Sequence, residues 1–418
     1  MRVLITSFAM DAHLNGSIPL AWALRTAGHE VRVASQPAAT ASITRAGLTA
    51  VPVGDDHRLD MTVRHAGPGM FATHADPDFL ENRPERLSLD FMRVSDTILT
   101  SMFYGQLNND SMVDDLVEYA RFWRPDLVVW EHFTFAGAVA ARASGAASAR
   151  ILSFPDTFMS VREEFVRRNA LAPEQEREDM LAEWLTWTLA RHGCDFDEEI
   201  VTGQYAIDQL SPSVSLTSGD HRIPMRYVPY NGPSPAVVPG WLYKEPERPR
   251  VCLTLGETIR KTEFPNAVEV GDVFEAVSDL DVELVALLSD DERDLVSGVP
   301  DNVRVEEYVP LHVLLPSCSA IVHHGGSGTW ATAAVYGVPQ IAMGWVWDAI
   351  YRARRLEELG AGLHIQSFTL TPELLREKLG RLLAEPSFAE NSGRLRAEME
   401  AAPTPNDAVA ALEQRIMG

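Results

Sequence analysis

The sequence predicts an α/β protein made of two doubly wound domains, each built on a parallel sheet, that face a central cleft. The chain has 418 residues, 46% of them hydrophobic, which is more than one hydrophobic core usually uses. Strand patterns alternate with helix patterns in two stretches, and a proline-rich segment separates these stretches. The predicted parts are an N-terminal domain at 1–226, a linker at 227–249, a C-terminal domain at 250–402, and a helix at 403–418 whose return to the N-terminal domain stays open.

The N-terminal stretch opens with a βαβ unit. Residues 2–7 form an apolar run typical of a buried strand, and an amphipathic helix follows the loop at Asn15-Gly16. Gly28 ends this helix, and the next apolar run gives a second strand that pairs parallel with the first. The elements expected in this stretch are strands at 2–7, 30–34 and 126–130 and helices at 19–27 and 135–143.

Residues 55–120 contain many aromatic residues, methionines and charges, but no clean period. In a doubly wound domain such an insertion usually shapes a pocket or a partner surface. We predict that its apolar side chains are exposed, and an exposed apolar patch usually binds a partner. Two other interpretations stay open, namely that they line a ligand pocket or pack in the core. The side chains concerned are those of Met70-Phe71, Phe91-Met92 and Met102-Phe103-Tyr104.

The segment at 227–249 contains several prolines and little periodicity, which is typical of an interdomain linker. A second domain then begins with an apolar strand that ends at Gly256. The acidic run Asp290-Asp291-Glu292 is interpreted as the solvated start of a helix. The elements expected in this stretch are strands at 250–255, 282–288, 303–305 and 320–322 and a helix at 330–336.

The segment from Val322 to Thr329, VHHGGSGT, joins two histidines to a glycine-rich turn between a strand and a helix. A helix N-terminus offers free backbone N–H groups and a positive dipole end to an anion, and glycines allow close approach. Histidine adds a hydrogen-bond donor for a phosphate oxygen. The turn matches neither the mononucleotide motif nor the dinucleotide motif. It therefore predicts a diphosphate site, with an ordinary glycine turn as the alternative.

His13 lies in the loop after the first strand. A histidine accepts a proton near neutral pH, so it is a natural base for activating a hydroxyl nucleophile. A solvated loop histidine is the alternative. Ligands of open parallel sheets bind beyond the carboxyl ends of the strands. The loops expected to converge on the cleft follow Thr6, Val129, Leu255 and Val322.

Composition and charge exclude several classes of partner. The formal net charge of −23 argues against nucleic acid or an anionic membrane. The three cysteines, Cys194, Cys252 and Cys318, are too far apart for a metal-ligand pattern, which suggests a reducing cytoplasm and core positions. Residues 1–8 are too short an apolar run for a secretory signal, and the chain has no run of about eighteen apolar residues. We therefore expect a cytoplasmic protein.

Several segments resemble one enzyme family. The turn at His323–Thr329 resembles the H-x-G-G-x-G-T motif of glycosyltransferases with two Rossmann-like domains, the GT-B fold, where it binds the diphosphate of a nucleotide sugar. Other matches are similar to the deoxysugar transferases of antibiotic biosynthesis, especially the macrolide type, and one of them, Asn108–Ser111, is distinctive of that subgroup. The matching segments are Ser7–Ala9, Pro19–Arg25, Ala27–Pro37, Asn108–Ser111, Trp123–Val128, Phe133–Gly137 and Pro229–Gly232.

The resemblance implies a catalytic role for His13. These enzymes place a catalytic histidine in this loop, just before a G-x-x-P-L helix start, which is Gly16–Leu20 here. In many relatives an aspartate at the end of the strand after Pro125 orients the histidine, but this chain has Glu131 there. Glu131 is therefore the candidate orienting acid, with an ordinary exposed carboxylate as the alternative.

On the donor side, Tyr308-Val309 resembles the W-V-P-Q segment on which the family's nucleotide base rests, with a core tyrosine as the alternative. Asp348 matches the aspartate of an aspartate-glutamine pair that binds sugar hydroxyls, but Ala349 replaces the glutamine. This loss fits a sugar that lacks hydroxyls, because an unpaired buried amide costs about 1–3 kcal/mol. The donor-binding candidates are Thr254, Gly256, Tyr308, Val309, His324, Gly326, Ser327, Gly328, Thr329, Trp345 and Asp348.

We therefore predict a metal-independent, inverting hexosyltransferase without a cofactor, which moves a deoxyhexose from a TDP-sugar to a hydroxyl of a polyketide-derived acceptor. His13 would deprotonate the acceptor, and the turn at His324 would bind the leaving diphosphate. The resemblance also implies a haem-free, cytochrome-like activator protein as partner, and it leaves a homodimer open. Alternatives are a nucleotide-sugar epimerase of the same fold and a non-catalytic protein that binds nucleotide sugar. A dehydrogenase is least expected, because the dinucleotide fingerprint is missing.

Overall fold

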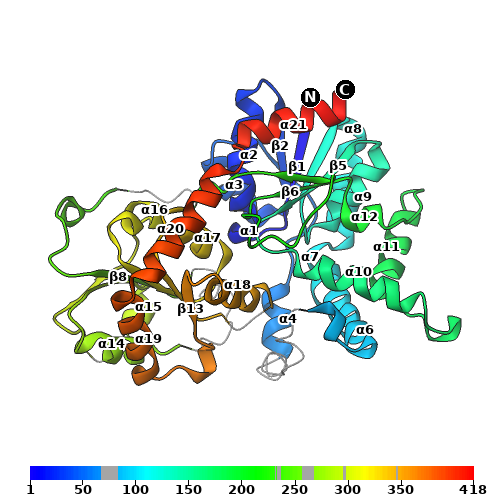
Figure 1. Cartoon of the computed structure of the whole chain (residues 1–418). Coiled ribbons are helices and arrows are strands. Elements are labelled where there is room, and N and C mark those ends of the chain that lie inside the picture. The colour runs from blue at the N-terminus through cyan, green and yellow to red at the C-terminus, as the bar shows by residue number, and fades with distance from the viewer. Residues whose placement is uncertain (67–82, 231, 233–236, 257–267, 295–297, 345–346) are drawn as a thin grey trace.

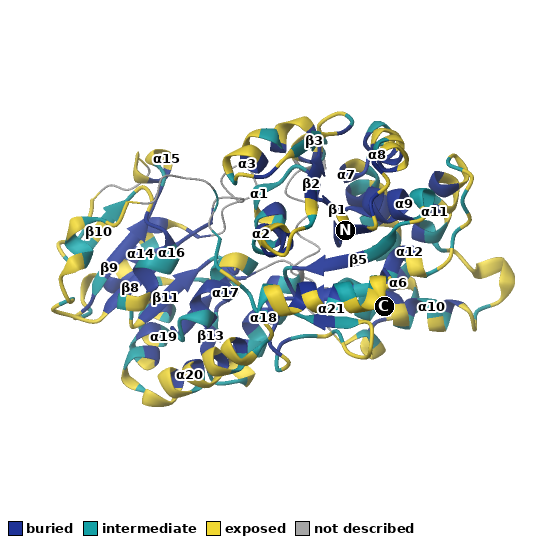
Figure 2. Cartoon of the chain, turned by 90° about the horizontal axis from the view of Figure 1, so that it is seen from above, coloured by how far each residue is buried: buried dark blue, intermediate teal, exposed yellow. Residues whose placement is uncertain are grey.

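The structure is a computed structural model, and it describes residues 1–66, 83–230, 232, 237–256, 268–294, 298–344 and 347–418. The chain forms two lobes, and each lobe has a twisted sheet with helices on both faces (Figure 1). Seen from above, the strands are buried in the middle of each lobe and the outer helix faces are exposed (Figure 2). The predicted α/β class with two doubly wound sheets is confirmed.

The N-terminal lobe contains a seven-stranded sheet in the order β3-β2-β1-β4-β5-β6-β7. All its strand pairs are parallel. The central strands are continuous apolar runs because helices cover both faces of the sheet. Its strands are β1 (Arg2–Thr6), β2 (Glu30–Ser35), β3 (Ala50–Pro52), β4 (Leu127–Glu131), β5 (Ala147–Leu152), β6 (Tyr205–Asp208) and β7 (Arg222–Pro224).

The described helices of this lobe include short 3-10 turns and one π-helical segment, η5. They are α1 (Asp11–Leu14), η1 (Asn15–Ser17), α2 (Ile18–Thr26), η2 (Pro37–Ala39), α3 (Thr40–Arg45), α4 (Leu59–Ala66), η4 (Pro84–Arg86), α6 (Leu89–Ile98), η5 (Leu99–Tyr104), α7 (Gly105–Leu107), α8 (Asp110–Trp123), α9 (Phe135–Ser144), α10 (Thr157–Asn169), η6 (Glu174–Glu176), α11 (Met180–Ala190) and α12 (Glu199–Thr202).

The prediction of exposed apolar side chains in residues 55–120 is wrong for most of those described. Met92 is buried against Phe165 of α10, and Phe103 and Tyr104 are buried in the main core of the lobe. The reason is that this segment folds into helices that pack on α9 to α11 and bury one face each. The pair Met70-Phe71 lies outside the described residues.

The C-terminal lobe contains a six-stranded sheet in the order β10-β9-β8-β11-β12-β13, again parallel throughout. Its strands are β8 (Arg250–Thr254), β9 (Glu283–Leu287), β10 (Val303–Glu306), β11 (Ala320–His323), β12 (Gln340–Ala342) and β13 (Gly362–His364). Its described helices are α14 (Val270–Ser278), α15 (Asp290–Asp294), α16 (Leu311–Leu314), η8 (Leu315–Ser317), α17 (Ser327–Val335), α18 (Trp347–Glu358), η9 (Ser367–Thr369), α19 (Pro372–Ala384) and α20 (Pro386–Ala401).

The acidic run at 290–292 does start a helix, α15, but it is not solvated throughout. Glu292 is buried, and its Oε2 atom accepts hydrogen bonds from the backbone N–H and the hydroxyl of Ser289. The expected helix at 330–336 is also longer than predicted. It begins at Ser327, so the second half of the glycine-rich turn forms its first turn.

The last helix, α21 (Pro405–Met417), leaves the C-terminal lobe and packs on α2 and β7 of the N-terminal lobe (Figure 1). Its buried residues Ala408, Val409 and Leu412 belong to the same core cluster as Leu20 and Leu24 of α2. The chain therefore crosses between the lobes twice, once before β8 and once before α21.

The order of the strands in each sheet determines where the candidate functional side chains lie close together. In each sheet the chain starts in the middle and reverses its direction of winding once, between β1 and β4 in one lobe and between β8 and β11 in the other. Ligands of doubly wound sheets bind beyond the strand ends at such a switch point. His13 follows β1, and Glu131 is the last residue of β4. In the other lobe, Gly256 follows β8 and His324 follows β11. The candidate residues therefore lie at the two switch points.

Among the described residues, no helix combines the length and the apolar content that a membrane crossing requires. The three cysteines are free, and only Cys252 is fully buried, whereas Cys194 and Cys318 are half-buried.

Candidate active site

His13 and Glu131 form a hydrogen-bonded pair at the switch point of the N-terminal lobe. The Nδ1 atom of His13 lies 2.9 Å from Oε1 of Glu131, although the two residues are 118 positions apart. His13 lies in the short helix α1 rather than in an open loop, and Glu131 is the last residue of β4. An ionised carboxylate only accepts hydrogen bonds, so Nδ1 of His13 carries the proton. The Nε2 atom of His13 is therefore left as a proton acceptor.

Glu131 is fully buried, so the alternative interpretation of an ordinary exposed carboxylate is wrong. Burial raises the pKa of Glu131, but His132, His13 and the hydrogen bonds to the carboxylate outweigh it and hold this pKa below its usual value. The Oε2 atom accepts from the backbone N–H of Phe133 at 3.0 Å and from the hydroxyl of Thr134 at 3.1 Å. The carboxylate thus stays ionised and fixed in orientation.

Aromatic rings enclose the imidazole of His13. The ring centroids of Phe8, Phe133 and Phe154 lie 4.5, 5.8 and 6.0 Å from its own. Its side chain nevertheless remains 19% exposed, so one part of the ring is open to a ligand. A partly exposed imidazole with an apolar surround suits a base that acts on a hydroxyl of a largely apolar molecule.

The structure shows the physical role of Asn108 in the motif Asn108–Ser111, which the sequence identified only by resemblance. Its buried amide donates to the backbone carbonyls of Tyr104 and Phe133 at 2.8 Å each, and its Oδ1 atom accepts from the backbone N–H of Ala136 at 2.9 Å. It therefore ties the end of η5 to the loop that follows Glu131. Asn109 caps α8 by accepting from the backbone N–H of Met112.

The glycine-rich turn presents a helix N-terminus at the switch point of the other lobe. Gly325 has a φ of +91°, which favours glycine, and Gly326 is the N-cap residue of α17. No side chain caps this helix, so the first-turn N–H groups of Ser327, Gly328 and Thr329 face outward from the turn. This arrangement is suited to binding a phosphate group.

The imidazole of His324 sits between two glycines. A Cβ atom added to Gly256 would lie 2.2 Å from Cε1 of His324, and one added to Gly326 would lie 2.3 Å from its Nε2 atom. Both distances are far below van der Waals contact. Gly256 and Gly326 are therefore required because they leave room for this ring beside the helix N-terminus.

His323 stabilises the backbone of the glycine-rich turn through a hydrogen bond from the buried side. Its fully buried ring accepts the backbone N–H of Gly325 at Nδ1, at 3.1 Å, and its Nε2 atom lies 2.9 Å from the amide oxygen of Gln340 on β12. Because Nδ1 is an acceptor, Nε2 carries the proton and the ring is neutral. Burial, with the positive charges of its neighbours, lowers the pKa of His323 to about 3.

We expect this histidine to make the C-terminal lobe sensitive to acid. Protonation of His323 is less favourable in the folded state than in the unfolded state. The contribution of this group to the free energy of unfolding is therefore fully present above the unfolded pKa of about 6.5, and it is lost as the pH falls towards the folded pKa of about 3. Between about pH 7 and about pH 4.5 the loss from this group is about 2–3 kcal/mol. Urea unfolding of the His323→Asn variant, which keeps an acceptor for Gly325, should show a pH dependence smaller by this amount. Equal dependence in both proteins would contradict the assignment.

Asp348 and Arg352 form a buried ion pair one helical turn apart on α18. The guanidinium of Arg352 also donates to the carbonyl oxygen of Gly325 at 2.6 Å. Burial lowers the pKa of Arg352 to about 9, so it remains charged at neutral pH. One carboxylate oxygen of Asp348 is thus held beside the turn by the guanidinium that also binds Gly325.

Ala349 packs directly under the turn. A Cβ atom added to Gly325 would lie 3.3 Å from the Cβ atom of Ala349, and one added to Gly344 would lie 3.0 Å from it. The small side chain at 349 therefore fills a buried contact between two backbone segments. Trp345, a predicted donor-binding residue, lies outside the described residues, and so does the side chain of Trp347.

The remaining donor-side candidates lie at strand ends of the same lobe. Thr254 is the last residue of β8, is nearly buried and pairs with His323 in the sheet. Tyr308 follows β10 and is 41% exposed, as a platform for a base requires. Val309 packs its side chain in the core, so only its backbone is available to a ligand.

The linker connects the two switch points. The hydroxyl of Tyr227 lies 3.3 Å from the carbonyl oxygen of Gly328, at the start of α17. Burial and then the carboxylate of Asp11 raise the pKa of Tyr230, and Tyr308 also contributes to this shift. Asp11 precedes His13 in α1, whereas Tyr308 is on the donor side. Tyr230 packs against a core cluster of the N-terminal lobe and Tyr227 contacts α17, so the linker contacts both lobes.

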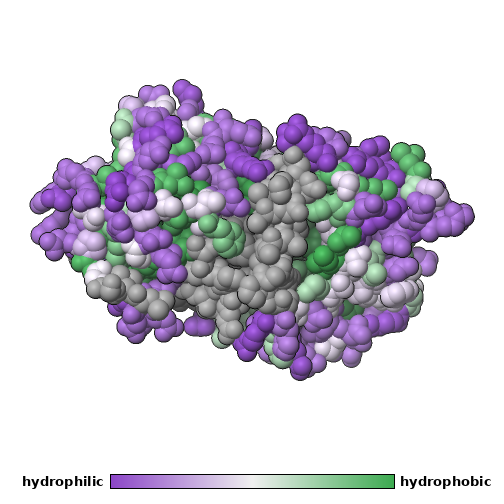
Figure 3. All heavy atoms as spheres, turned by 90° about the horizontal axis from the view of Figure 1, so that it is seen from below, coloured by the Kyte–Doolittle hydropathy of each residue, from purple (hydrophilic) through white to green (hydrophobic). Residues whose placement is uncertain are grey.

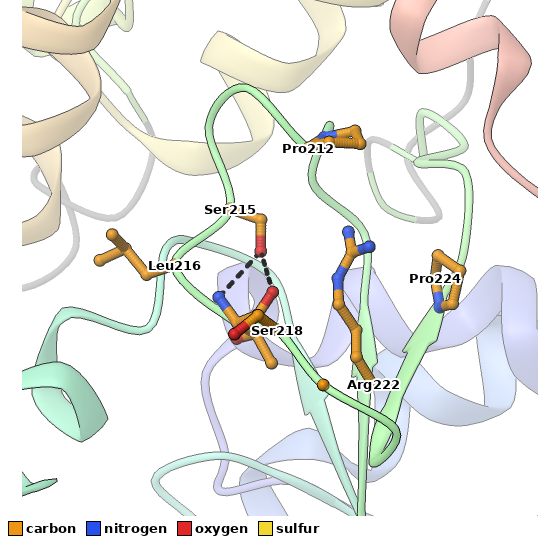
Figure 4. A pocket seen from close by; sticks show the side chains of 8 residues that line it. Pro212, Ser215, Leu216, Ser218, Arg222 and Pro224 are labelled. Carbon is orange, nitrogen blue, oxygen red and sulfur yellow. Dashed lines mark hydrogen bonds between the residues drawn. The ribbon is translucent and has the colours of Figure 1, made fainter.

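A separate pocket of about 530 Å³ lies at the edge strand β7 (Figure 4). Two of its polar side chains, Arg222 and Ser215, are paired within the protein, because both donate to the buried carboxylate of Asp208. The strands β5 and β6 lie between β4 and β7 in the sheet, so this pocket is distinct from the site of His13. In the part of the chain that the structure describes, no three His, Cys, Asp or Glu side chains gather as metal ligands would.

Comparison with known proteins matches both lobes to one family. The N-terminal domain described as erythromycin biosynthesis protein CIII-like matches residues 22–256, and the corresponding C-terminal domain matches residues 271–415. Aklavinone 7-beta-L-rhodosaminyltransferase of Streptomyces galilaeus is 58% identical over 99% of this chain and 95% of its own length. The 10-deoxymethynolide desosaminyltransferase of Streptomyces venezuelae is 51% identical over 99% of this chain and 97% of its own length.

A solved structure agrees over the whole chain. The crystal structure of the glycosyltransferase VinC in complex with DTDP is 41% identical, has a TM-score of 0.88 and covers 100% of both chains. The arrangement of both lobes therefore follows that of a thymidine-diphosphate-binding protein.

Proposed function

The chain belongs to the erythromycin biosynthesis protein CIII-like family and is a glycosyltransferase, and from this premise we propose that it transfers a deoxysugar from a TDP-sugar to a hydroxyl of a polyketide-type acceptor. The observation that carries the proposal is the pairing of a His13–Glu131 dyad in one lobe with an uncapped helix N-terminus beside His324 in the other. The first suits activation of a hydroxyl, and the second suits a diphosphate.

On the acceptor side, Nε2 of His13 removes the proton from the attacking hydroxyl. Glu131 keeps Nδ1 protonated and stabilises the imidazolium that forms. The oxygen then attacks the anomeric carbon of the donor on the face opposite the diphosphate. Direct displacement of this kind inverts the anomeric centre.

On the donor side, the N–H groups at the start of α17 and the imidazole of His324 stabilise the negative charge that develops on the leaving diphosphate. Tyr308 supports the thymine ring, and the carboxylate of Asp348 accepts a hydrogen bond from the sugar. These groups supply the stabilisation that a metal ion provides in other transferases, so we propose that the reaction requires neither a metal nor a cofactor.

We predict that His324→Ala weakens the binding of TDP itself by about tenfold, because one hydrogen bond to a charged phosphate is lost. Isothermal titration calorimetry with TDP measures this directly. The matched control is His312→Ala, a histidine of α16 in the same lobe, which should bind TDP normally. Unchanged affinity in His324→Ala would move the diphosphate elsewhere, and loss of activity with a chelator would contradict the metal-free mechanism.

The substrate proposal is tested by product analysis. A panel of TDP-deoxysugars is offered with aklavinone and 10-deoxymethynolide, and mass spectrometry should find an acceptor that has gained one deoxysugar. Labelled donor without acceptor separates the alternatives, because an epimerase changes the donor whereas a transferase hydrolyses it slowly at most. A panel that yields no glycoside, with TDP bound normally, would favour a non-catalytic nucleotide-sugar-binding protein.

We further propose that the chain works in the cytoplasm with a cytochrome-like activator protein. Support comes from exposed apolar side chains on α6, where Val94 is 57% and Ile98 is 42% exposed. Hydrophobic residues also gather in patches on the lower face of the molecule, which is otherwise mostly hydrophilic (Figure 3). The purified chain should then show low turnover that the activator restores. Full turnover without it would exclude this partner, and sedimentation tests the homodimer.

A further inference from the structure

The buried side chain of Gln209 joins the segment that carries His13 to the end of a neighbouring strand. Gln209 directly follows β6 and is 3% exposed. Its Nε2 atom donates hydrogen bonds to the backbone carbonyl oxygens of Gly16, at 3.1 Å, and of Leu152, at 3.4 Å. Gly16 lies in η1, which directly follows α1 and its His13, and Leu152 is the last residue of β5. One amide group therefore holds η1 against the end of β5.

The end of β5 contacts both η1 and the imidazole of His13. A Cβ atom added to Gly16 would lie 2.3 Å from Oγ of Ser153 and 3.4 Å from Nε2 of Gln209, so the backbone of η1 lies directly against these two side chains. The ring of Phe154, the next residue, meets that of His13 edge-on, with centroids 6.0 Å apart. A shift of η1 away from β5 would therefore move His13 within its aromatic surround.

A second glutamine makes a comparable contact at the other end of the same two strands. Gln204 directly precedes β6 and is exposed. Its Oε1 atom accepts from the backbone N–H of Ser148 in β5 at 3.1 Å, and its Nε2 atom donates to Glu199 at 3.4 Å. This is the amino end of the parallel strands, whereas ligands bind beyond the carboxyl end. The two glutamines thus hold β5 and β6 at opposite ends, and Gln209 in addition holds η1.

The residues that follow Gln209 leave the N-terminal lobe and pack in the C-terminal lobe. Leu210 and Val214 are buried in one core cluster with Trp330 of α17, the helix that begins at the diphosphate turn. The backbone carbonyl oxygen of Val214 also accepts from the hydroxyl of Tyr351 on α18 at 3.3 Å. Gln209 therefore lies where the lobe of His13 joins the packing around the donor-side helices.

We propose that Gln209 is a positioning residue that sets the place of His13 relative to the diphosphate turn, a role that rests on the proposed function of His13. Its amide holds η1, and its chain neighbours are fixed against α17. A base acts over hydrogen-bond distances, and a displacement of about 1 Å can lower a rate by about 100-fold. The diphosphate turn makes no contact through η1, so the binding of TDP does not depend on this amide.

The test compares Gln209→Met with Gln204→Met in the full chain. Methionine is similar to glutamine in length but donates no hydrogen bond. In single-turnover kinetics at saturating acceptor, Gln209→Met should lower kcat by about tenfold or more. Its affinity for TDP, measured by calorimetry, should stay nearly unchanged, and Gln204→Met should keep the kcat of the parent protein. A loss of kcat no larger than that of Gln204→Met would overturn the proposal, and so would an equal loss of TDP affinity.

A measurement without any ligand keeps this result separate from the proposed function. Amide hydrogen exchange, followed by mass spectrometry, reports how firmly the peptides that cover α1 and η1 are held. In Gln209→Met these peptides should exchange faster, whereas those of α17 should exchange as in the parent protein. Unchanged exchange at η1 would overturn the proposal. Faster exchange in a chain that yields no glycoside would support the positioning of His13 and contradict only the proposed transfer.

Two further variants keep the test decisive if Gln209→Met fails to fold. Gln209→Asn keeps the amide but is shorter by one methylene group, so its donor is withdrawn from η1. Gly16→Ala moves η1 from the other side, because the added methyl group would meet Oγ of Ser153. Both should reproduce the loss of kcat, and Ser153→Gly added to Gly16→Ala should restore most of it. A parent-like kcat in Gln209→Asn, or a double variant as slow as Gly16→Ala, would contradict the proposal.

Discussion

Replacing His13 with alanine is expected to lower kcat by about 100-fold or more, which is the scale of general base catalysis. The affinity for the TDP-sugar should stay nearly unchanged, because the diphosphate turn lies in the other lobe. The physical reason is that Nε2 of His13 is the acceptor left by the hydrogen bond to Glu131, and alanine supplies no acceptor. Single-turnover kinetics at saturating acceptor, together with calorimetry of TDP, measure both quantities.

Two variants show whether this loss is specific. His57→Gln changes another histidine beside Phe8 and should keep most of the turnover. Glu131→Gln keeps the shape of the acid but removes its charge, so it should lower kcat less than His13→Ala does. Near-normal turnover of His13→Ala would mean that a different group is the base.

The second large effect is expected at Arg352. Arg352→Ala should destabilise the C-terminal lobe by about 3–5 kcal/mol, because it leaves the carboxylate of Asp348 without its buried partner. It also removes the donor to the carbonyl oxygen of Gly325, so the diphosphate turn should loosen and TDP binding should weaken. Urea unfolding with and without TDP measures the two consequences separately.

The control for this prediction is an exposed arginine with an acidic neighbour. Arg381 pairs with Glu385 on the surface of α19, and Arg381→Ala should cost less than about 1 kcal/mol. Removing both buried charges, in Arg352→Met with Asp348→Asn, should recover much of the stability lost in Arg352→Ala. A cost at Arg352 no larger than that at Arg381 would show that the buried pair does not stabilise the lobe.

The sequence predicted the fold class and the longer elements well, because continuous apolar runs and glycine turns are local signals. The strands at 2–7, 30–34, 126–130 and 250–255 are all present with small shifts of their ends. Short strands such as β12, which has only three residues, are too short to give a recognisable hydrophobic pattern in the sequence. The start of α17 was placed three residues late, because Ser327 and Gly328 are poor helix formers whose conformation the neighbouring backbone imposes.

The contacts within the site were beyond sequence reasoning. Neighbours in sequence gave no indication that Nδ1 of His13 lies 2.9 Å from Oε1 of Glu131, since that contact depends on the parallel pairing of β1 with β4. Gln340, whose amide oxygen accepts the hydrogen bond from Nε2 of His323, lies in one of the short strands that the sequence did not reveal. Apolar side chains such as Met92 were placed at the surface because helices without a clean period hide which face is buried. These features are properties of packing, not of local sequence.

The return of α21 to the N-terminal lobe constrains how the protein is made. The lobe that is synthesised first leaves the ribosome with part of its hydrophobic core uncovered on α2, since Ala408, Val409 and Leu412 complete that core. Synthesis must pass through the entire second lobe before those residues exist. The first lobe therefore remains incompletely packed and prone to aggregation until the second lobe and α21 have been translated. Slow elongation through the second lobe would lengthen that exposure and lower the yield of folded protein.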